Sequence, residues 1–128
     1  MIVVDASALV DALTGAEVVT DRLADERLTA PAVIDAEAGS ALRRLWMIGE
    51  LGPALADSVI AALPAVDVLR FEHRSLIPRA WELRHNLSFT DALYVALAEQ
   101  LGIPLVTLDA RLAGAPGIRA DVEVLRRA

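Results

Sequence analysis

The chain has 128 residues, which fits one domain with room for a sheet and several helices. Hydrophobic residues make up 55% of it and aromatic residues only 4%, so the core must consist of Ala, Val, Leu and Ile. The absence of cysteine excludes disulfides, thiolate nucleophiles and Cys-type zinc sites. No apolar run approaches the ~18 residues of a membrane span, and no signal peptide precedes the first predicted strand. We therefore expect a soluble, cytoplasmic protein that does not enter a membrane.

The formal net charge of -6 is unusual for a protein that handles nucleic acid. The acids of a metal site, predicted below, would account for most of this charge, so the net charge decides little. All twelve basic residues are arginine, whose planar guanidinium holds phosphate or carboxylate through two hydrogen bonds. Codon bias in a GC-rich genome is the simpler explanation of the missing lysine.

Short apolar runs alternate with helical patterns along the whole chain. Pro31 introduces the longest helix, Pro64 stops another, and Gly102 ends a third. In chain order, the patterns predict a strand over 2–4, helices over 6–13 and 17–25, a strand over 28–30, helices over 32–48 and 53–63, a strand over 66–69, a helix over 79–85 that begins at 79 or already at 72, a helix over 89–101, a strand over 105–108, a helical turn over 110–113 and an edge strand over 122–124. We therefore expect a single α/β domain over residues 1–128, a three-layer α/β/α sandwich with a central parallel sheet.

Four carboxylates, Asp5, Glu37, Asp91 and Asp109, occupy related places in these elements. Asp5 and Asp109 follow two apolar strands, at the edge where open α/β sheets bind ligands. Asp91 opens a helix, and Glu37 lies in the apolar stripe of another, where an uncompensated charge is costly. Clustered acids repel unless a cation joins them, and hard oxygen ligands suit Mg²⁺ or Mn²⁺. The sequence therefore predicts a divalent-metal site and phosphodiester hydrolysis.

Asp5 and Glu37 also have structural interpretations. Asp5 and Ser7 before a helix are typical of an N-cap, whereas at a metal site Ser7 would support Asp5 through a hydrogen bond. Glu37 shares the buried stripe with Ile34 and Ala41, and its structural alternative is an ion pair with one of the arginines. A buried Glu without a partner would be neutral, and a Glu beside a metal would be ionised.

Asp91 and Asp109 have structural interpretations as well. Ser88-x-x-Asp91 resembles a capping box, which is a common and weak signal. Asp109 is placed to cap the helical turn over 110–113, and Thr107 before it reads as an ordinary strand residue.

The two histidines and the aromatic residues carry no chemistry in this interpretation. His73 and His85 read as exposed residues at helix ends, without the spacing of a triad. The aromatic residues are too scattered for a platform that stacks bases, and we expect them in the core or at interfaces: Trp46, Phe71, Trp81 and Phe89.

Taken in order, these stretches resemble a PIN domain, and in particular a VapC-type toxin of a bacterial toxin–antitoxin pair. The resemblance spans nearly the whole chain, and four weak motifs in this order are together specific. It is carried by Ile2-Val3-Val4-Asp5-Ala6-Ser7-Ala8-Leu9, by Glu37 with Ser40-Ala41-Leu42-Arg43-Arg44-Leu45, by Leu87-Ser88-Phe89-Thr90-Asp91-Ala92-Leu93-Tyr94-Val95-Ala96-Leu97-Ala98-Glu99, and by Pro104-Leu105-Val106-Thr107-Leu108-Asp109-Ala110-Arg111-Leu112.

The resemblance implies a metal-dependent endoribonuclease. Asp5, Glu37, Asp91 and Asp109 match the four acids of the family that hold Mg²⁺ or Mn²⁺, and Ser7 matches its hydroxyl position. It also implies a homodimer and a VapB-type antitoxin whose tail blocks the acidic pocket. The sequence names neither the RNA that is cut nor the number of metal ions.

Two other classes of function compete with this one. A phosphoryl-transfer domain would use Asp5 as a covalent acceptor, but a receiver-type site needs a lysine, and a haloacid-dehalogenase-like phosphatase needs an Asp where this chain has Ser7. A non-catalytic PIN domain that binds RNA or a protein partner is the closer alternative. It leaves the cost of four retained acids unexplained.

Overall fold

The computed structural model describes residues 1–127 and contains one five-stranded sheet in which every neighbouring pair of strands is parallel. The strand order is β3-β2-β1-β4-β5, so β1 lies in the middle and pairs with both β2 and β4. The strands are β1 (Ile2–Val4), β2 (Leu28–Pro31), β3 (Val68–Phe71), β4 (Leu105–Thr107) and β5 (Val122–Val124).

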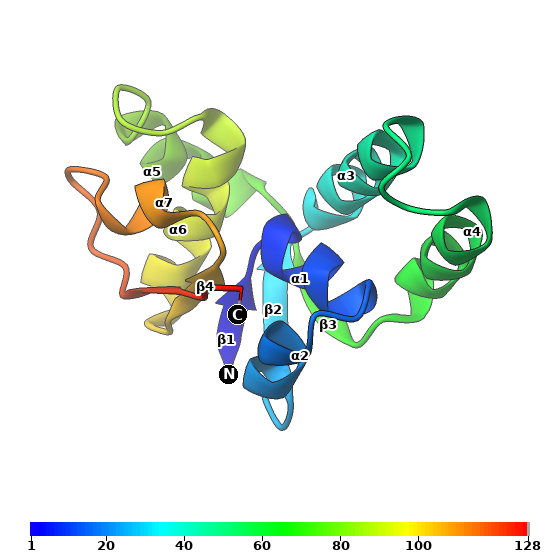
Figure 1. Ribbon diagram of the computed structural model, residues 1–128. Coiled ribbons are helices and arrows are strands. Elements are labelled where there is room, and N and C mark those ends of the chain that lie inside the picture. The colour runs from blue at the N-terminus through cyan, green and yellow to red at the C-terminus, as the bar shows by residue number, and fades with distance from the viewer. Residues whose placement is uncertain (128) are drawn as a thin grey trace.

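Helices cover both faces of the sheet (Figure 1). α5 and α6 lie on one side, whereas α1 and α2 lie on the other, with α3 and α4 packed beyond α1. The expected three-layer α/β/α sandwich is thereby confirmed. The helices are α1 (Ala6–Leu13), α2 (Glu17–Leu23), α3 (Ile34–Met47), α4 (Pro53–Ala62), α5 (Ile77–Glu82), α6 (Phe89–Leu101) and α7 (Ala110–Ala113), with 3-10 turns at Leu63–Ala65 and Arg74–Leu76.

α6 is the central helix of the core. Its residues 92–98 are all buried, and it contacts β1, β2, β4 and α5. Ser88 caps its first turn, and Gly102 ends it with a positive φ of 65° that a side chain would strain. Because residues 92–98 are buried on every side and the helix is capped at both ends, α6 is a rigid base for Asp91 in its first turn.

The predicted elements are all present, but several boundaries differ. β3 begins at Val68, two residues later than expected, because Leu63–Ala65 forms a 3-10 turn and the Val66 N–H donates to its first carbonyl at 3.2 Å. Pro31 ends β2 rather than opening α3. Pro78 is tolerated because it lies in the first turn of α5, where its missing N–H has no helical partner.

Among residues 1–127, none of the helices has both the length and the apolar character that a bilayer crossing requires.

Candidate functional site

The register between β1 and β4 places two side chains of the site next to each other. Val4 lies opposite Val106, so the residues that follow them, Asp5 and Thr107, meet at the carboxyl edge of the sheet. The Thr107 hydroxyl donates a short hydrogen bond to Oδ2 of Asp5 and accepts the Asp109 N–H at 3.0 Å. Thr107 is therefore part of the site, although its sequence position reads as an ordinary strand residue.

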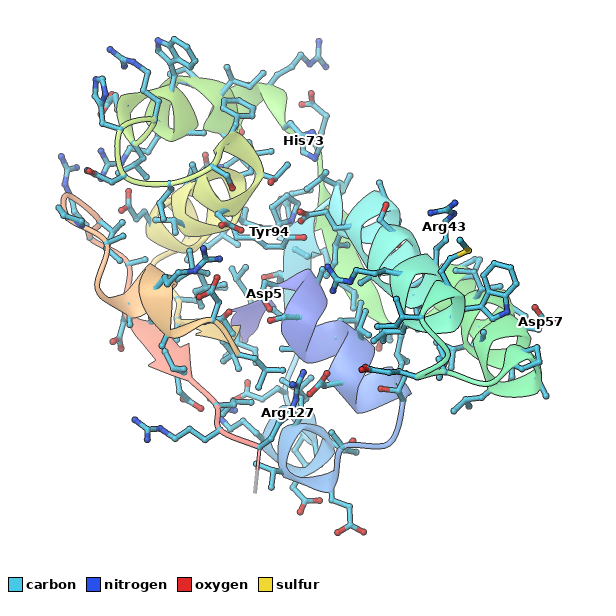
Figure 2. All side chains as sticks on the ribbon, turned by 45° about the horizontal axis from the view of Figure 1, so that its top comes forward. Asp5, Arg43, Asp57, His73, Tyr94 and Arg127 are labelled. Carbon is cyan, nitrogen blue, oxygen red and sulfur yellow. The ribbon has the colours of Figure 1, made fainter. Side chains whose placement is uncertain are left out.

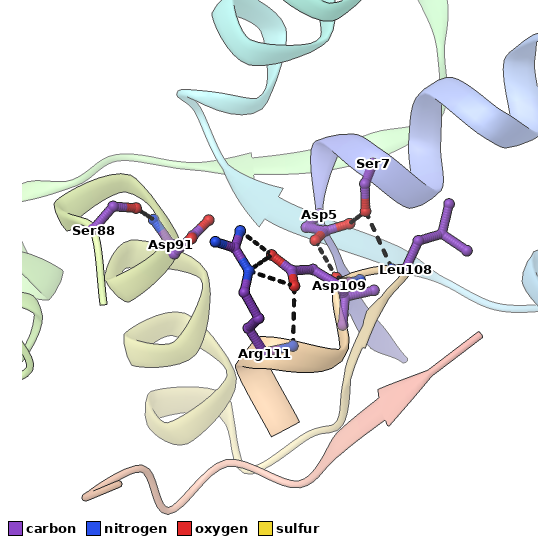
Figure 3. Close-up of polar contacts among 8 residues, drawn as sticks. Asp5, Ser7, Ser88, Asp91, Leu108, Asp109 and Arg111 are labelled. Atoms are coloured by element: carbon purple, nitrogen blue, oxygen red, sulfur yellow. Dashed lines mark hydrogen bonds and ion pairs between the residues drawn. The ribbon is translucent and has the colours of Figure 1, made fainter. Parts of the chain in front are cut away.

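The other oxygen of Asp5 is held from α1 (Figure 3). Its Oδ1 accepts the Ser7 hydroxyl at 2.7 Å and the Ala8 N–H at 3.0 Å. Ser7 in turn accepts the Leu108 N–H at 3.2 Å, which ties α1 to the end of β4. Asp5 is thus an N-cap and is also fixed by Ser7, so the two sequence interpretations hold together.

Asp5 is buried, with 7% of its surface exposed. Burial raises the pKa of its carboxyl group, the three donors from Thr107, Ser7 and Ala8 lower it again, and the negative charge of Asp91 raises it further. No basic side chain within residues 1–127 forms an ion pair with Asp5. An ionised Asp5 would therefore gain stability from a cation.

Asp91 stands in the first turn of α6, where its N–H donates to the Ser88 hydroxyl at 3.2 Å. The capping role of Ser88 is confirmed, and it uses only the backbone of Asp91. The Asp91 carboxylate makes no ion pair with any residue that the structure describes, and its negative charge raises the pKa of Asp5. Capping and a role in the site are therefore compatible at this position.

Glu37 lies half-buried in the first turn of α3. The alternative that Glu37 pairs with an arginine is wrong for the part of the chain that the structure describes, since the ion pair on this helix belongs to Asp35. Arg70 donates to both oxygens of Asp35, at 2.7 and 2.9 Å. Glu37 instead raises the pKa of the hydroxyl of Tyr94, a buried residue of α6.

Asp109 is held by its own helix. Its Oδ1 accepts the Arg111 N–H at 3.0 Å, and the Arg111 guanidinium pairs with its Oδ2 at 2.7 Å. This pairing lowers the pKa of Asp109. The pair lines a pocket of about 290 Å³ together with Ser88 and Asp91. The positive group in this pocket is therefore the guanidinium of Arg111. The predicted cap on α7 is present, and Arg111 is an addition to the site.

The predicted convergence of the four acids is partial. Asp5, Glu37 and Asp91 all raise the pKa of the buried Tyr94 hydroxyl, whereas Asp109 forms an ion pair with Arg111. As the side chains stand, no three carboxylate or imidazole groups of residues 1–127 are close enough to hold a metal ion together. The donor set nevertheless fits Mg²⁺ or Mn²⁺, because it offers hard oxygens and the buried Asp5 lacks a cationic partner.

The histidines and four of the five aromatic residues lie outside this centre, to which only Tyr94 among the aromatic residues of the described part belongs. The prediction of an exposed His73 is wrong: the residue is half-buried, and its Nε2 accepts the Val33 N–H at 2.9 Å just before α3. His85 is exposed, as expected. Three of the four large aromatic side chains are too exposed for the core, namely Trp46 (48%), Trp81 (59%) and Phe89 (42%), whereas Phe71 is partly buried.

The sequence matches the PIN domain family over residues 2–118. This chain belongs to the PIN-domain family. Among PIN-domain proteins, Ribonuclease VapC1 of Mycobacterium tuberculosis is 45% identical over an alignment of 129 positions, gaps included, which covers 97% of each chain. The resemblance to VapC-type PIN domains is thereby confirmed.

Solved PIN-domain structures share the fold. The sarcin–ricin loop cleaving toxin VapC20 of M. tuberculosis superposes with a TM-score of 0.68 at 23% identity, over 92% of this chain and 96% of that one. A toxin–antitoxin complex from Klebsiella pneumoniae gives a TM-score of 0.72 at 18% identity over the full length of both chains. At these identities the structures support the architecture alone.

Proposed function

We propose that this protein acts as a single PIN domain that hydrolyses RNA phosphodiester bonds as the metal-dependent toxin of a toxin–antitoxin pair. The observation that carries the proposal is the buried Asp5 carboxylate, which faces the charge of Asp91 and has no basic partner within residues 1–127. Such an arrangement is costly unless a divalent cation joins it. The identity to Ribonuclease VapC1 over nearly the whole chain supports ribonuclease chemistry.

Asp5, Glu37, Asp91 and Asp109 would hold the Mg²⁺ or Mn²⁺ ion. The bound ion supplies stabilisation of charge on the phosphate and a water molecule of lowered pKa. Asp5 enters the site already oriented, because both of its oxygens accept hydrogen bonds from fixed donors. Asp109 would be free to hold the ion once Arg111 turns away, and the Arg111 side chain is 86% exposed.

The competing functions fit the site less well. Asp5 would be a poor covalent phosphate acceptor, because it is buried and both oxygens already accept hydrogen bonds. A non-catalytic domain would carry the repulsion between Asp5 and Asp91 without use. Activity that depends on metal separates the ribonuclease from this second alternative.

The partner would be a VapB-type antitoxin. The structural neighbours include toxin–antitoxin complexes, among them the one from K. pneumoniae. On this chain, α3 and α4 enclose an apolar groove of about 400 Å³ lined by Leu42, Trp46, Ala56 and Ile60 among others, which suits an apolar partner segment. An arginine of the partner would bind the acidic pocket through charge-assisted hydrogen bonds. Homodimerisation stays a prediction, which sedimentation of the purified protein tests.

The partner is tested by expressing the protein with and without the product of the gene upstream. We expect that product to co-purify with this chain and to relieve growth arrest. A product that does neither removes the main support for the toxin–antitoxin assignment.

The activity is tested by incubating the purified protein with a panel of structured RNAs, because single-stranded loops expose their backbone to a small pocket. We expect cleavage with Mn²⁺, no cleavage with EDTA, and no cleavage by Asp5→Asn. Glu50→Gln removes the same charge at an exposed position after α3 and should cut like the wild type. Cleavage that persists in EDTA or in Asp5→Asn would overturn the assignment of the metal site.

A further inference from the structure

Tyr94 carries a polar group that the site described so far does not use. Its side chain is 1% exposed, and its hydroxyl is buried without a hydrogen-bond partner among residues 1–127. An unmade hydrogen bond at a buried hydroxyl is costly, so such groups in native proteins nearly always find an acceptor. The acceptor must come from the groups that surround this hydroxyl.

Those groups are carboxylates. Burial raises the pKa of Tyr94, and the side chain of Glu37 raises it further, followed by the charges of Asp5 and Asp91. Tyr94 and Asp5 both lie in the middle of the molecule, between α6 and α3 (Figure 2). Three of the four predicted metal ligands therefore affect this hydroxyl.

Glu37 is the carboxylate that is available to accept a hydrogen bond from this hydroxyl. Asp5 already accepts hydrogen bonds at both oxygens, from Ser7, Ala8 and Thr107. Glu37 has no ion pair in the described part of the chain, and its side chain has more rotatable bonds than that of Asp. Glu37 is also the carboxylate with the largest effect on this hydroxyl, whereas the Tyr94 ring is fixed within the buried run 92–98 of α6.

We propose that Tyr94 is a positioning residue whose hydroxyl donates a hydrogen bond to Glu37 and so holds this α3 side chain toward Asp5 and Asp91. The inference rests on the proposed function, because it names how one predicted ligand is oriented. Tyr94 lies three residues after Asp91 and therefore on the same face of α6. One helix thus carries the predicted ligand Asp91 and the residue that would orient Glu37. Supporting hydrogen bonds of this kind fix ligand orientation, and their loss costs about 10- to 100-fold in metal affinity or activity.

The contact itself is tested without metal or RNA. Tyr94 is the only tyrosine in the chain, so labelling tyrosine with ¹³C at Cζ gives a single NMR signal that reports on the hydrogen bond of its hydroxyl. We expect Glu37→Ala to shift this signal. Glu50→Ala removes an equal charge at an exposed position and should leave the signal unchanged. A signal that is the same in Glu37→Ala and in the wild type would overturn the contact.

The positioning role is tested with Tyr94→Phe, which keeps the ring and its packing. We expect Mn²⁺ to bind about 10- to 100-fold more weakly by calorimetry and kcat to fall while the KM for RNA stays constant. In a Glu37→Ala background the same substitution should have no further effect on Mn²⁺ affinity. Equal Mn²⁺ affinity of Tyr94→Phe and wild type would overturn the positioning role. A wild type that binds no Mn²⁺ would instead overturn the proposed function, and the NMR signal would still report on the contact.

Discussion

Replacing Thr107 with Val removes one hydroxyl from the centre of the site and keeps the shape of the side chain. The Thr107 hydroxyl donates to Oδ2 of Asp5 and accepts the N–H of Asp109, and the residue is fully buried. The valine variant therefore deprives the buried Asp5 carboxylate of a donor that favours its charged form. Asp5, a predicted metal ligand, would be harder to ionise, although Asp5 itself has not been changed.

The size of the effect follows from the burial of both groups. A hydrogen bond to a charged group is worth about 1.5–3 kcal/mol. Without this bond the charged form of Asp5 is less stable, so the pKa of its carboxyl group should rise further in Thr107→Val. The acidic limb of the profile of kcat/KM against pH should move to higher pH, and Mn²⁺ should bind about 10- to 100-fold more weakly at neutral pH.

Thr29→Val is the matched control. Thr29 is equally buried, but its hydroxyl donates at 2.9 Å to the neutral carbonyl of Ile2, inside the sheet. We expect this variant to lose about 1 kcal/mol of stability and to keep the wild-type pH profile and Mn²⁺ affinity. Calorimetry, thermal melts and cleavage rates across a pH series measure all three quantities. An unshifted acidic limb in Thr107→Val, or an equal shift in Thr29→Val, would refute this reasoning.

Three further predictions concern the acids and their neighbours. Asp91→Asn should abolish RNA cleavage, yet in EDTA at low salt the variant should be at least as stable as the wild type, because the substitution relieves repulsion between carboxylates. Saturating Mn²⁺ should reverse the order of the two melting temperatures. A variant clearly less stable in EDTA would mean that Asp91 is chiefly a cap. The pKa of Asp5 is raised by folding, so this carboxyl group stabilises the fold below its unfolded pKa of about 4, and that stabilisation is lost as pH rises through the folded pKa. In EDTA, the free energy of unfolding of Asp5→Asn should therefore increase relative to that of the wild type as pH rises toward neutral. A difference in unfolding free energy that is independent of pH would contradict this. Arg111→Ala should bind Mn²⁺ more tightly, and less so at high salt, because the metal no longer displaces a guanidinium from Asp109; weaker binding measured by calorimetry would argue that Arg111 supports the site.

The type and order of the elements could be read from the sequence because the apolar patterns are strong. The buried run Ile2–Val4 and the long apolar helix Phe89–Leu101 left few alternatives, and both lie where they were expected. Turns were harder to place. Pro64 enters a 3-10 turn instead of ending the segment, and this delays the following strand to Val68.

The candidate site was predictable where it depends on strand ends and missed where it depends on pairing across the fold. Asp5 and Asp109 follow strands, so their place at one edge follows from the sheet alone. Thr107 gains its role only through the register that sets it beside Asp5, and the sequence does not contain that register. Arg111 is two residues from Asp109, and only the geometry of α7 reveals that its guanidinium pairs with this predicted ligand. The assignment of the four acids as ligands stays a prediction.

The pairing of β1 with β4 also has a consequence for synthesis on the ribosome. The hydrogen bond between Asp5 and Thr107 joins residues that are 102 positions apart, and β4 must pair with the middle strand of the sheet before this bond forms. At about 5–20 residues per second, the ribosome needs roughly 5–20 s to pass from one of these residues to the other. During that interval Glu37 and Asp91 are added to a nascent chain that has no assembled acidic pocket. Any activity that depends on the acidic pocket therefore arises only after almost the entire domain has been translated.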